Sequence, residues 1–271
     1  NMPAALVRNF SKNRINWLQF IPTITQSNLL ALEIGPGTGG VSRQLSEYYN
    51  VVALERSAEN CAFLNQCADE SDLPILSVKK SDPPIPFADE QFDLVVLVGS
   101  LEWLGYCSDQ PASLVVHRYL EEVYRVLKPG GSLYISSENA SYIGYYFGIK
   151  EAHSLLRFIS LLNPADADDI SNHYTGQNFK NPTFSPSDLD LDLQKIGFQP
   201  GRAFWLHPDY STPAYMIPLD APDKILEYFI EQRLNPWDFQ GERSSIYRFY
   251  CLLNKKLMKN FIEHYGLITS K

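Results

Sequence analysis

The sequence predicts an α/β fold in which helices cover both faces of a doubly wound, mostly parallel sheet. Three observations lead to this fold class. Short apolar runs alternate with amphipathic stretches through the first half of the chain, as in repeated strand–helix units. Residues 92–98 form the most apolar run, which is typical of a central strand buried on both faces. A glycine-rich loop, residues 35–40, directly follows the first apolar run, where such folds bind ligands.

The order of elements follows from the apolar pattern and from the residues that interrupt it. Seven short apolar runs predict strands at 29–34, 51–54, 75–78, 92–98, 132–136, 198–206 and 214–219. Helical spacing predicts helices over the first 20 or so residues and at 41–49, 58–68, 111–127, 185–196, 222–234 and 246–265. Residues 128–131, Lys-Pro-Gly-Gly, end the helix at 111–127 with a turn, and Gly197 closes the helix that Ser185 caps.

The same pattern predicts the domain organisation. Residues 1–28 form an N-terminal helical segment, residues 29–219 the main domain, and residues 220–271 a C-terminal helical appendage. Within the main domain, residues 138–183 lose the alternation and are rich in Tyr, Phe, Asn, Ser and His. Because an insertion of this length in a compact domain is usually functional, we expect it to lie on the side of the functional site that receives the acceptor substrate.

Composition and charge exclude several classes of protein. The 271 residues are 45% hydrophobic and 20% charged, which excludes collagen-like, disordered and disulfide-scaffold chains. The net charge of −8 argues against a nucleic-acid partner, and the nearest basic patch is Lys255, Lys256 and Lys259. No run approaches the roughly 18–20 apolar residues of a membrane span. The start lacks the pattern of a signal peptide, and the four cysteines form no CxxC pair, so we expect a cytoplasmic location.

The glycine loop indicates a nucleoside ligand. Gly35, Gly37 and Gly40 satisfy the dinucleotide pattern G-x-G-x-x-G. Glu33, two residues earlier, would repel a pyrophosphate but would favour the sulfonium and ammonium groups of S-adenosylmethionine (SAM). The loop therefore favours SAM over NAD, and an NAD(P)-dependent oxidoreductase is kept as a rival reading.

Further carboxylates follow the next predicted strands. Glu55 ends the second strand, where it can accept hydrogen bonds from ribose hydroxyls. Asp82 follows the third strand and can accept one from an adenine amino group, while Gly99 and Ser100 follow the fourth. Because the carboxyl ends of parallel strands meet at one edge of the sheet, these residues are expected to form a single site.

This ordered set resembles the motifs of class I SAM-dependent methyltransferases. The resemblance is carried by residues 32–39, Glu55, Asp82, 92–96 and 127–131, and it extends over about residues 29–137. It implies a Rossmann-like methyltransferase fold, SAM as cofactor and S-adenosylhomocysteine as product. It implies that Glu33 contacts the methionine end, Glu55 the ribose and Asp82 the adenine. The expected cofactor-binding residues are Glu33, Gly35, Gly37, Gly39, Glu55, Arg56, Ser81, Asp82, Gly99, Ser100 and Leu101.

A narrower resemblance extends over later segments. Residues 137–139, 145–148, 173–176, 183–185 and 208–213 are similar to methyltransferases tied to bacterial surface-polysaccharide and glycosyltransferase systems. This implies a saccharide or saccharide-linked acceptor, and a larger glycan-biosynthesis assembly as a partner. The chain departs from that pattern at Asn172, where those proteins usually have Asp.

Candidate catalytic residues lie after the predicted strands and in the insertion. Methyl transfer needs an acceptor held in line with the methyl group, and an oxygen acceptor gains from a general base. Glu138, directly after the fifth strand, and His173, in the insertion, are the expected catalytic residues. His117, His153, His207 and His264 lack supporting context. The expected substrate contacts are Trp103, Asn139 and Tyr145.

No His, Cys, Asp and Glu residues have metal-ligand spacing along the chain, so no metal is predicted. The expected function is SAM-dependent methyl transfer to an oxygen of a saccharide or saccharide-linked molecule. Two further alternatives stay open beside the oxidoreductase. One is methylation of another small molecule, such as a secondary metabolite. The other is a non-catalytic SAM-binding module of a glycan-processing assembly.

Overall fold

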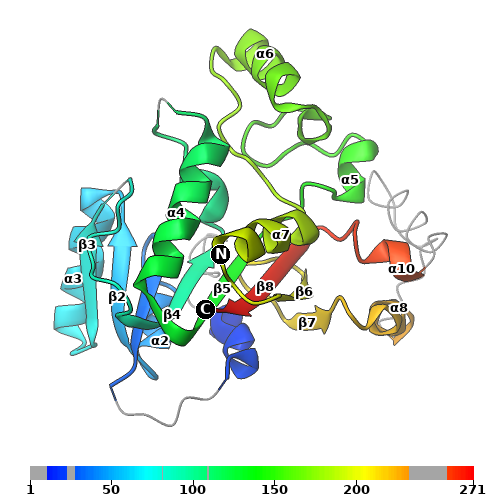
Figure 1. Ribbon diagram of the computed structural model, residues 1–271. Helices are drawn as coiled ribbons and strands as arrows, with labels where there is room; N and C mark the ends of the chain where they lie inside the picture. Colours follow the sequence, from blue (N-terminus) through cyan, green and yellow to red (C-terminus); the bar gives the residue numbers. More distant parts are fainter. Residues whose placement is uncertain (1–10, 23–27, 81, 109, 232–254) are drawn as a thin grey trace, which may run out of the picture.

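The computed structural model describes residues 11–22, 28–80, 82–108, 110–231 and 255–271. One sheet of eight strands, in the order β3-β2-β1-β4-β5-β8-β6-β7, forms its centre (Figure 1). The predicted α/β class is present, with one strand more than the seven predicted. In chain order the strands are β1 (Leu30–Ile34), β2 (Asn50–Glu55), β3 (Ile75–Lys79), β4 (Phe92–Val98), β5 (Leu127–Glu138), β6 (Arg202–His207), β7 (Tyr215–Pro218) and β8 (His264–Ser270).

Strands β1 to β5 form the parallel half of the sheet. Strand β1 pairs with β2 and β4, β2 pairs with β3, and β4 pairs with β5, all in parallel. The run 92–97 of β4 is buried throughout, which agrees with its predicted central place. The carboxyl ends of β1, β2 and β4, where Ile34, Glu55 and Val98 lie, therefore meet at one edge.

The second half of the sheet is antiparallel. Strand β8 lies between β5 and β6 and is antiparallel to both, so β6 runs in the same direction as β5. The edge strand β7 pairs with β6 as a hairpin. The carboxyl ends of β5 and β6 consequently lie at the same edge as those of the parallel half.

Strand β8 corrects the prediction for the end of the chain. Residues 246–265 were expected to be a helix within a helical appendage at 220–271. Instead, residues 264–270 belong to the central sheet, and residues 265–267 are buried. A short apolar run in the core of a sheet has no amphipathic period that distinguishes it from a helix. The predicted helix residues 246–254 lie outside the described residues, and the division at 219/220 otherwise stays a prediction.

Helices cover both faces of the sheet, as predicted. Ser57 caps α3 (Ala58–Glu70) by accepting a hydrogen bond from the Asn60 amide at 3.2 Å, and Ser185 caps α7 (Pro186–Ile196) by accepting one from the Asp188 amide at 3.1 Å. The helices and 3₁₀ turns are η1 (Lys12–Phe20), α2 (Ser42–Leu45), α3 (Ala58–Glu70), η2 (Leu101–Trp103), α4 (Ala112–Val126), α5 (Ile143–Tyr146), η3 (Ile159–Leu161), α6 (Pro164–Thr175), α7 (Pro186–Ile196), α8 (Pro222–Glu231) and α10 (Lys255–Met258). None of the helices in these ranges has the length and apolar character that a bilayer crossing requires.

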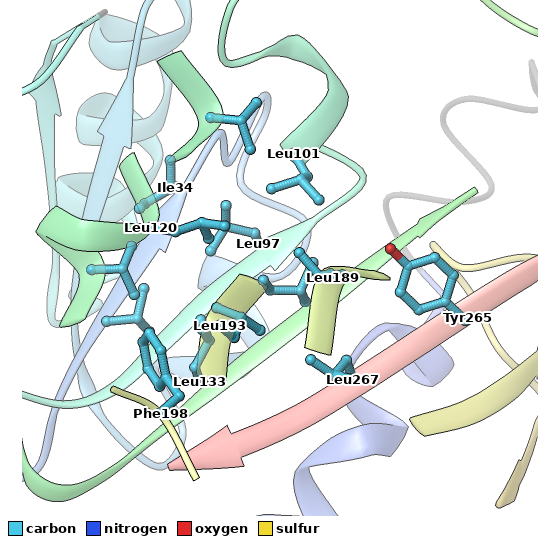
Figure 2. Packing of buried hydrophobic residues seen from close by; sticks show 14 of the residues in the cluster. Ile34, Leu97, Leu101, Leu120, Leu133, Leu189, Leu193, Phe198, Tyr265 and Leu267 are labelled. Carbon is cyan, nitrogen blue, oxygen red and sulfur yellow. The ribbon is translucent and has the colours of Figure 1, made fainter. Parts of the chain in front are cut away.

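The core consists of two clusters, one on each face of the sheet. On one face, Leu120 of α4 and Leu189 and Leu193 of α7 pack over Leu133 and Leu267 of the sheet (Figure 2). On the other face, η1 and α2 cover β1 and β4, and the ring of Trp17 stacks on that of Tyr134 with centroids 4.2 Å apart. Each large apolar side chain removed from water contributes about 1.5–3 kcal/mol. The sheet is thus held rigidly enough to position groups at its edge.

Two residues of the resemblance have a structural role at the opposite edge. The carboxylate of Asp93 on β4 is buried and accepts a hydrogen bond from the Leu30 amide of β1 at 2.9 Å. It also pairs with the Lys128 ammonium of β5 at 2.8 Å. One carboxylate therefore ties three neighbouring strands together near the amino ends of β1 and β4.

Candidate active site

The glycine loop lies against the carboxyl ends of β2 and β4. The Gly35 amide donates a hydrogen bond to the Leu54 carbonyl at 2.9 Å. Gly35 has a φ of +76°, and a Cβ there would come within 2.6 Å of the Ser100 Cβ, so only glycine fits. At Gly39, a Cβ would come within 2.3 Å of the Leu64 side chain. Gly39 therefore lets α3 pack against the loop, and it is absent from the cavity described below.

Glu55 is fixed at the end of β2 by backbone amides. One carboxylate oxygen accepts hydrogen bonds from the amides of Arg56 and Ser57, both at 2.8 Å. The other accepts one from the Gly37 amide at 3.0 Å. A carboxylate has about four lone-pair sites, so Glu55 keeps the capacity to accept from a ribose hydroxyl. Its carboxylate links the glycine loop to the second strand, and its predicted contact with a ribose stays a prediction.

A cavity of about 240 Å³ opens at this edge of the sheet. It contains seven of the residues predicted to bind cofactor or substrate, namely Gly35, Gly37, Glu55, Arg56, Gly99, Ser100 and Trp103. The other lining residues are Ile34, Leu54, Asn60, Lys80, Leu104, Cys107 and Tyr119. The small residues leave room for a nucleoside close to the backbone, and the fixed carboxylate offers a hydrogen-bond acceptor to its polar side.

A second cavity, of about 490 Å³, adjoins the first. Consecutive residues line the two cavities at two places, Cys107 with Ser108 and Tyr119 with Arg118. Asp82 lines this second cavity, together with residues 83 and 84. The structure thus places Asp82 next to the Glu55 cavity, on the side where α4 begins, and its predicted adenine contact stays a prediction.

Two predicted cofactor residues, Glu33 and Leu101, are buried away from the cavity. Glu33 is buried and accepts a hydrogen bond from the Ser42 hydroxyl of α2, and it is absent from the cavity lining. Burial raises the pKa of Glu33 to about 7, although the Ser42 hydrogen bond opposes this shift. The Leu101 side chain is fully buried in the core, and Ser81 lies outside the described residues.

A cluster of four ionisable side chains lies beyond the carboxyl ends of β4 and β5. It comprises Glu102 of η2, Glu138 at the end of β5, and Glu151 and His153 of the insertion; we call it the carboxylate–histidine cluster. Nδ1 of His153 is 2.5 Å from a Glu151 oxygen, and Nε2 is 3.9 Å from Oε1 of Glu102. All four side chains are at most 9% exposed. Such burial is unusual for three carboxylates around one imidazole.

Neighbouring hydroxyl and amide groups orient the carboxylates of the cluster. The Ser137 hydroxyl donates to Glu102 at 3.1 Å, and the Tyr145 hydroxyl donates to Glu138 at 3.4 Å. The Ser154 amide and hydroxyl donate to the second oxygen of Glu151 at 2.6 and 2.7 Å. Tyr145, a predicted substrate contact, therefore lies at the cluster.

Burial and mutual repulsion set the charges in the cluster. Burial raises the pKa of Glu102 and raises that of Glu138 to about 7, where His153 partly offsets the shift. Burial is the largest single influence on Glu151 and His153 and opposes their ionisation, but their mutual hydrogen bond, together with the Ser154 donors to Glu151 and the carboxylates around His153, outweighs it. The pKa of Glu151 is therefore lowered and that of His153 is raised. Glu151 and His153 form an ion pair, and the charges of this pair act electrostatically on Glu102 and Glu138.

Trp103 connects the cluster to the first cavity. Its side chain lines the cavity, and its ring meets the His153 ring edge-on with centroids 4.9 Å apart. Tyr210 lies close to the same region, because a Cβ on Gly99 would come within 2.2 Å of its ring. A methyl donor in the cavity and an acceptor at the cluster would therefore be neighbours.

Two predicted site residues lie outside both the cavity and the cluster. His173 is exposed on α6, where its ring meets Tyr174 edge-on, and the imidazole of the cluster belongs to His153 instead. Asn139 is fully buried, and its amide donates to the carbonyls of Asn260 and Ile262 at 3.0 and 2.8 Å. Its own carbonyl accepts from the Ser141 amide. Asn139 thus fastens β5 to the segment before β8 and has no donor left for a substrate.

The sequence offered one signal for His153 that was missed. Glu151 and His153 are two residues apart, so a single turn brings an imidazole and a carboxylate together. Glu138, Glu151 and His153 each place a potential metal ligand within 4.8 Å of the others. The prediction that no metal binds relied on the spacing of potential ligands along the sequence. Because the fold brings together ligands that are not regularly spaced in the sequence, that spacing no longer supports the prediction.

Comparison with known proteins identifies the kind of domain that the chain contains. Residues 32–135 match a family model described as a methyltransferase domain. The chain is 27% identical over 169 residues to the mitochondrial arginine-hydroxylase NDUFAF5 of Rattus norvegicus, which covers 62% of this chain and 42% of that protein. It is 32% identical over 103 residues to phthiotriol/phenolphthiotriol dimycocerosates methyltransferase 1 of Mycobacterium ulcerans, covering 38% and 35%. The chain thus spans less than half the length of these curated relatives.

A solved structure shares the fold. Phosphoethanolamine N-methyltransferase 2 of Haemonchus contortus, in complex with phosphomonomethylethanolamine and S-adenosylhomocysteine, superposes with a TM-score of 0.53. The two proteins are 14% identical, and the match covers 95% of this chain and 51% of that one. Residues 32–135 therefore match a methyltransferase domain, and the chain shares its fold with a structurally characterised methyltransferase. The family match describes the class of this domain and not the activity of the whole protein. The relatives' names include a hydroxylase, so the class alone does not fix the reaction of the whole chain.

Proposed function

We propose that this chain transfers the methyl group of S-adenosylmethionine to a hydroxyl oxygen of a small acceptor. The observation that carries the proposal is the carboxylate–histidine cluster, which shares Trp103 with the cofactor cavity. The cluster provides buried proton acceptors next to the place where the methyl group of the cofactor would lie. A site that only bound the cofactor would not need them.

The reaction is a single displacement. The acceptor oxygen forms a bond to the methyl carbon while the bond from that carbon to sulfur breaks, and the sulfonium leaves as the neutral thioether of S-adenosylhomocysteine. The hydroxyl proton passes to a carboxylate of the cluster. Glu138 is the proton acceptor that we assign, because it is the carboxylate that directly ends β5 and is the least buried of the three. Tyr145 orients it through its hydroxyl.

We extend the proposal to a saccharide or saccharide-linked acceptor. The segments 137–139, 145–148 and 208–213 that resemble saccharide-associated methyltransferases lie around this edge of the sheet. The partly exposed ring of Trp103 offers an aromatic face beside the polar acceptors of the cluster, a combination that suits the C–H surface and hydroxyls of a sugar. The cytoplasmic location and the partnership with a glycan-assembly system stay predictions.

A transfer assay with SAM labelled in its methyl group tests the function. The acceptor panel comprises nucleotide sugars, a hydroxylated lipid, a phenol and an arginine-containing peptide. We expect label in a nucleotide-sugar hydroxyl. Label in the lipid or phenol alone would replace the saccharide acceptor and keep methyl transfer. Binding of S-adenosylhomocysteine without transfer to any acceptor would favour a non-catalytic module, and binding of NADH alone would contradict the cofactor itself.

A further inference from the structure

The carboxylate–histidine cluster contains more carboxyl groups than cationic partners. Three glutamates meet at one imidazole, and Glu263 adds a fourth carboxylate that acts on Glu138. Among the described residues, the ion pairs of these buried carboxylates involve only His153 as the cation. Buried charges in proteins are usually paired or bound to a metal, because taking an isolated carboxylate out of water is costly. An additional cation would correct the imbalance.

The geometry of the cluster fits a small cation. The potential ligand atoms of Glu138, Glu151 and His153 lie within 4.8 Å of one another. Metal–ligand bonds of 2.0–2.2 Å separate ligand atoms by about 3–4 Å, so only a small contraction is needed. The residues come from both β5 and the insertion, so their convergence is a product of the fold and not of one acidic loop.

An unsatisfied oxygen supplies an independent observation. Oε1 of Glu102 has no hydrogen-bond partner within the described part of the chain, although the residue is fully buried. It points toward His153, with 3.9 Å between Oε1 and Nε2. A buried carboxylate oxygen without a donor is expensive, and such atoms usually indicate a missing ligand or a functional group. A cation within the cluster would give this oxygen a partner.

We propose that the carboxylate–histidine cluster binds one divalent transition-metal ion of the Mn²⁺, Fe²⁺ or Zn²⁺ type, with Glu138, Glu151 and His153 as ligands and Glu102 beside them. Oxygen-only sites select Mg²⁺ and Ca²⁺, whereas an imidazole among carboxylates favours first-row transition metals. The role of the ion rests on the proposed function: it would hold the acceptor oxygen next to the methyl group and make its hydroxyl easier to deprotonate. The binding of the ion does not depend on that role.

The test measures metal binding directly on the metal-stripped full chain. Mn²⁺ is titrated and the free ion is followed by electron paramagnetic resonance. We expect one Mn²⁺ to bind, with an affinity at least tenfold weaker in His153→Ala and in Glu151→Gln. The matched controls are His173→Ala and Glu121→Gln, which change exposed residues on α6 and α4 and should bind as the wild type does. Absence of binding to the wild type, or binding that both site variants retain, would overturn the proposal.

A second measurement separates this proposal from the proposed function and from misfolding. S-adenosylhomocysteine binding is measured by calorimetry on every variant, without metal. Cofactor binding with no Mn²⁺ binding overturns the metal site and leaves the methyltransferase reading intact. If both site variants also lose the cofactor, the visible absorption of Co²⁺ bound to the wild type decides. Bands of a site with a nitrogen donor support the proposal, and the spectrum of hydrated Co²⁺ overturns it. Binding of an acceptor molecule that carries an ammonium group at the cluster, in place of Mn²⁺, would also overturn the proposed metal site.

Discussion

The two halves of the site are built in different ways. On the cofactor side, each functional residue follows its own parallel strand: the glycine loop follows β1, Glu55 ends β2 and Gly99 follows β4. On the acceptor side, the cluster joins η2, β5 and a loop of the insertion, and Asn139 holds the segment before β8 in place. A site made of strand ends can be inferred from local patterns. A site made by long-range folding cannot, because no local rule brings its parts together.

The largest expected effect concerns the acceptor side alone. Glu138→Gln keeps the size of the side chain but removes the proton acceptor, so we expect the kcat of methyl transfer to fall about 1,000-fold, within the range for loss of a general base. The S-adenosylhomocysteine Kd should stay within twofold of the wild type. A parallel loss of cofactor affinity would show that the two halves are not independent. Glu70→Gln, at the end of α3, serves as the exposed control.

The next effect concerns Glu33, which lies behind the glycine loop. Its pKa is about 7 in the fold and about 4.5 when unfolded, so between these pH values the folded chain holds more protons. Its contribution to stability is therefore present at low pH and is lost as pH rises through about 7. Relative to wild type, Glu33→Gln should gain about 3 kcal/mol in free energy of unfolding between pH 4.5 and 7.5, because one pKa unit is worth about 1.4 kcal/mol.

Urea unfolding of both proteins across this pH range measures the difference. A pH-independent difference would contradict the buried position of Glu33. If the variant also bound S-adenosylhomocysteine more than tenfold more weakly, the predicted contact with the methionine end would be supported despite the absence of Glu33 from the cavity lining.

Glu55→Ala tests the contribution of the cofactor side to binding of S-adenosylhomocysteine. It removes the partner of the Gly37 amide and the acceptor for the ribose hydroxyls, and hydrogen bonds to charged groups contribute about 1.5–3 kcal/mol each. We expect S-adenosylhomocysteine to bind about 100-fold more weakly by calorimetry. Mn²⁺ binding should not change, because Glu55 lies outside the cluster. Glu59→Ala, an exposed change in the first turn of α3, is the matched control.

The smallest expected effect tests the long-range fastening of the acceptor side. Asn139→Ala removes two buried hydrogen bonds to the Asn260 and Ile262 carbonyls, so we expect a loss of about 2 kcal/mol in the free energy of unfolding. Urea denaturation measures it, and calorimetry should find the cofactor affinity unchanged. An unchanged stability together with a raised acceptor KM would restore the substrate role that the sequence suggested.

These contrasts explain what the sequence could and could not predict. The parallel strands, their order of appearance and the place of Glu55 follow from apolar runs and turn residues, which are local signals. Residues 265–267 form a buried run with no distinguishing period, so β8 was missed. His153 and His173 have the same residue type and both lie in the insertion. Only the path of the chain brings one of them beside Glu102 and leaves the other exposed on α6.

The position of β8 has a consequence for the order in which the molecule can be assembled during synthesis. Within the described part of the sheet, β8 is the strand that joins β6 and its hairpin partner β7 to β5, and it follows them late in the chain. The parallel half, with its glycine loop and Glu55, can therefore form before β8 is available to pair with β6. The same late strand pairs with Glu138 through His264, so the acceptor edge is completed by the last segment of the sheet to be translated. A nascent chain would accordingly acquire the cofactor half first and the acceptor half only when its eighth strand is available.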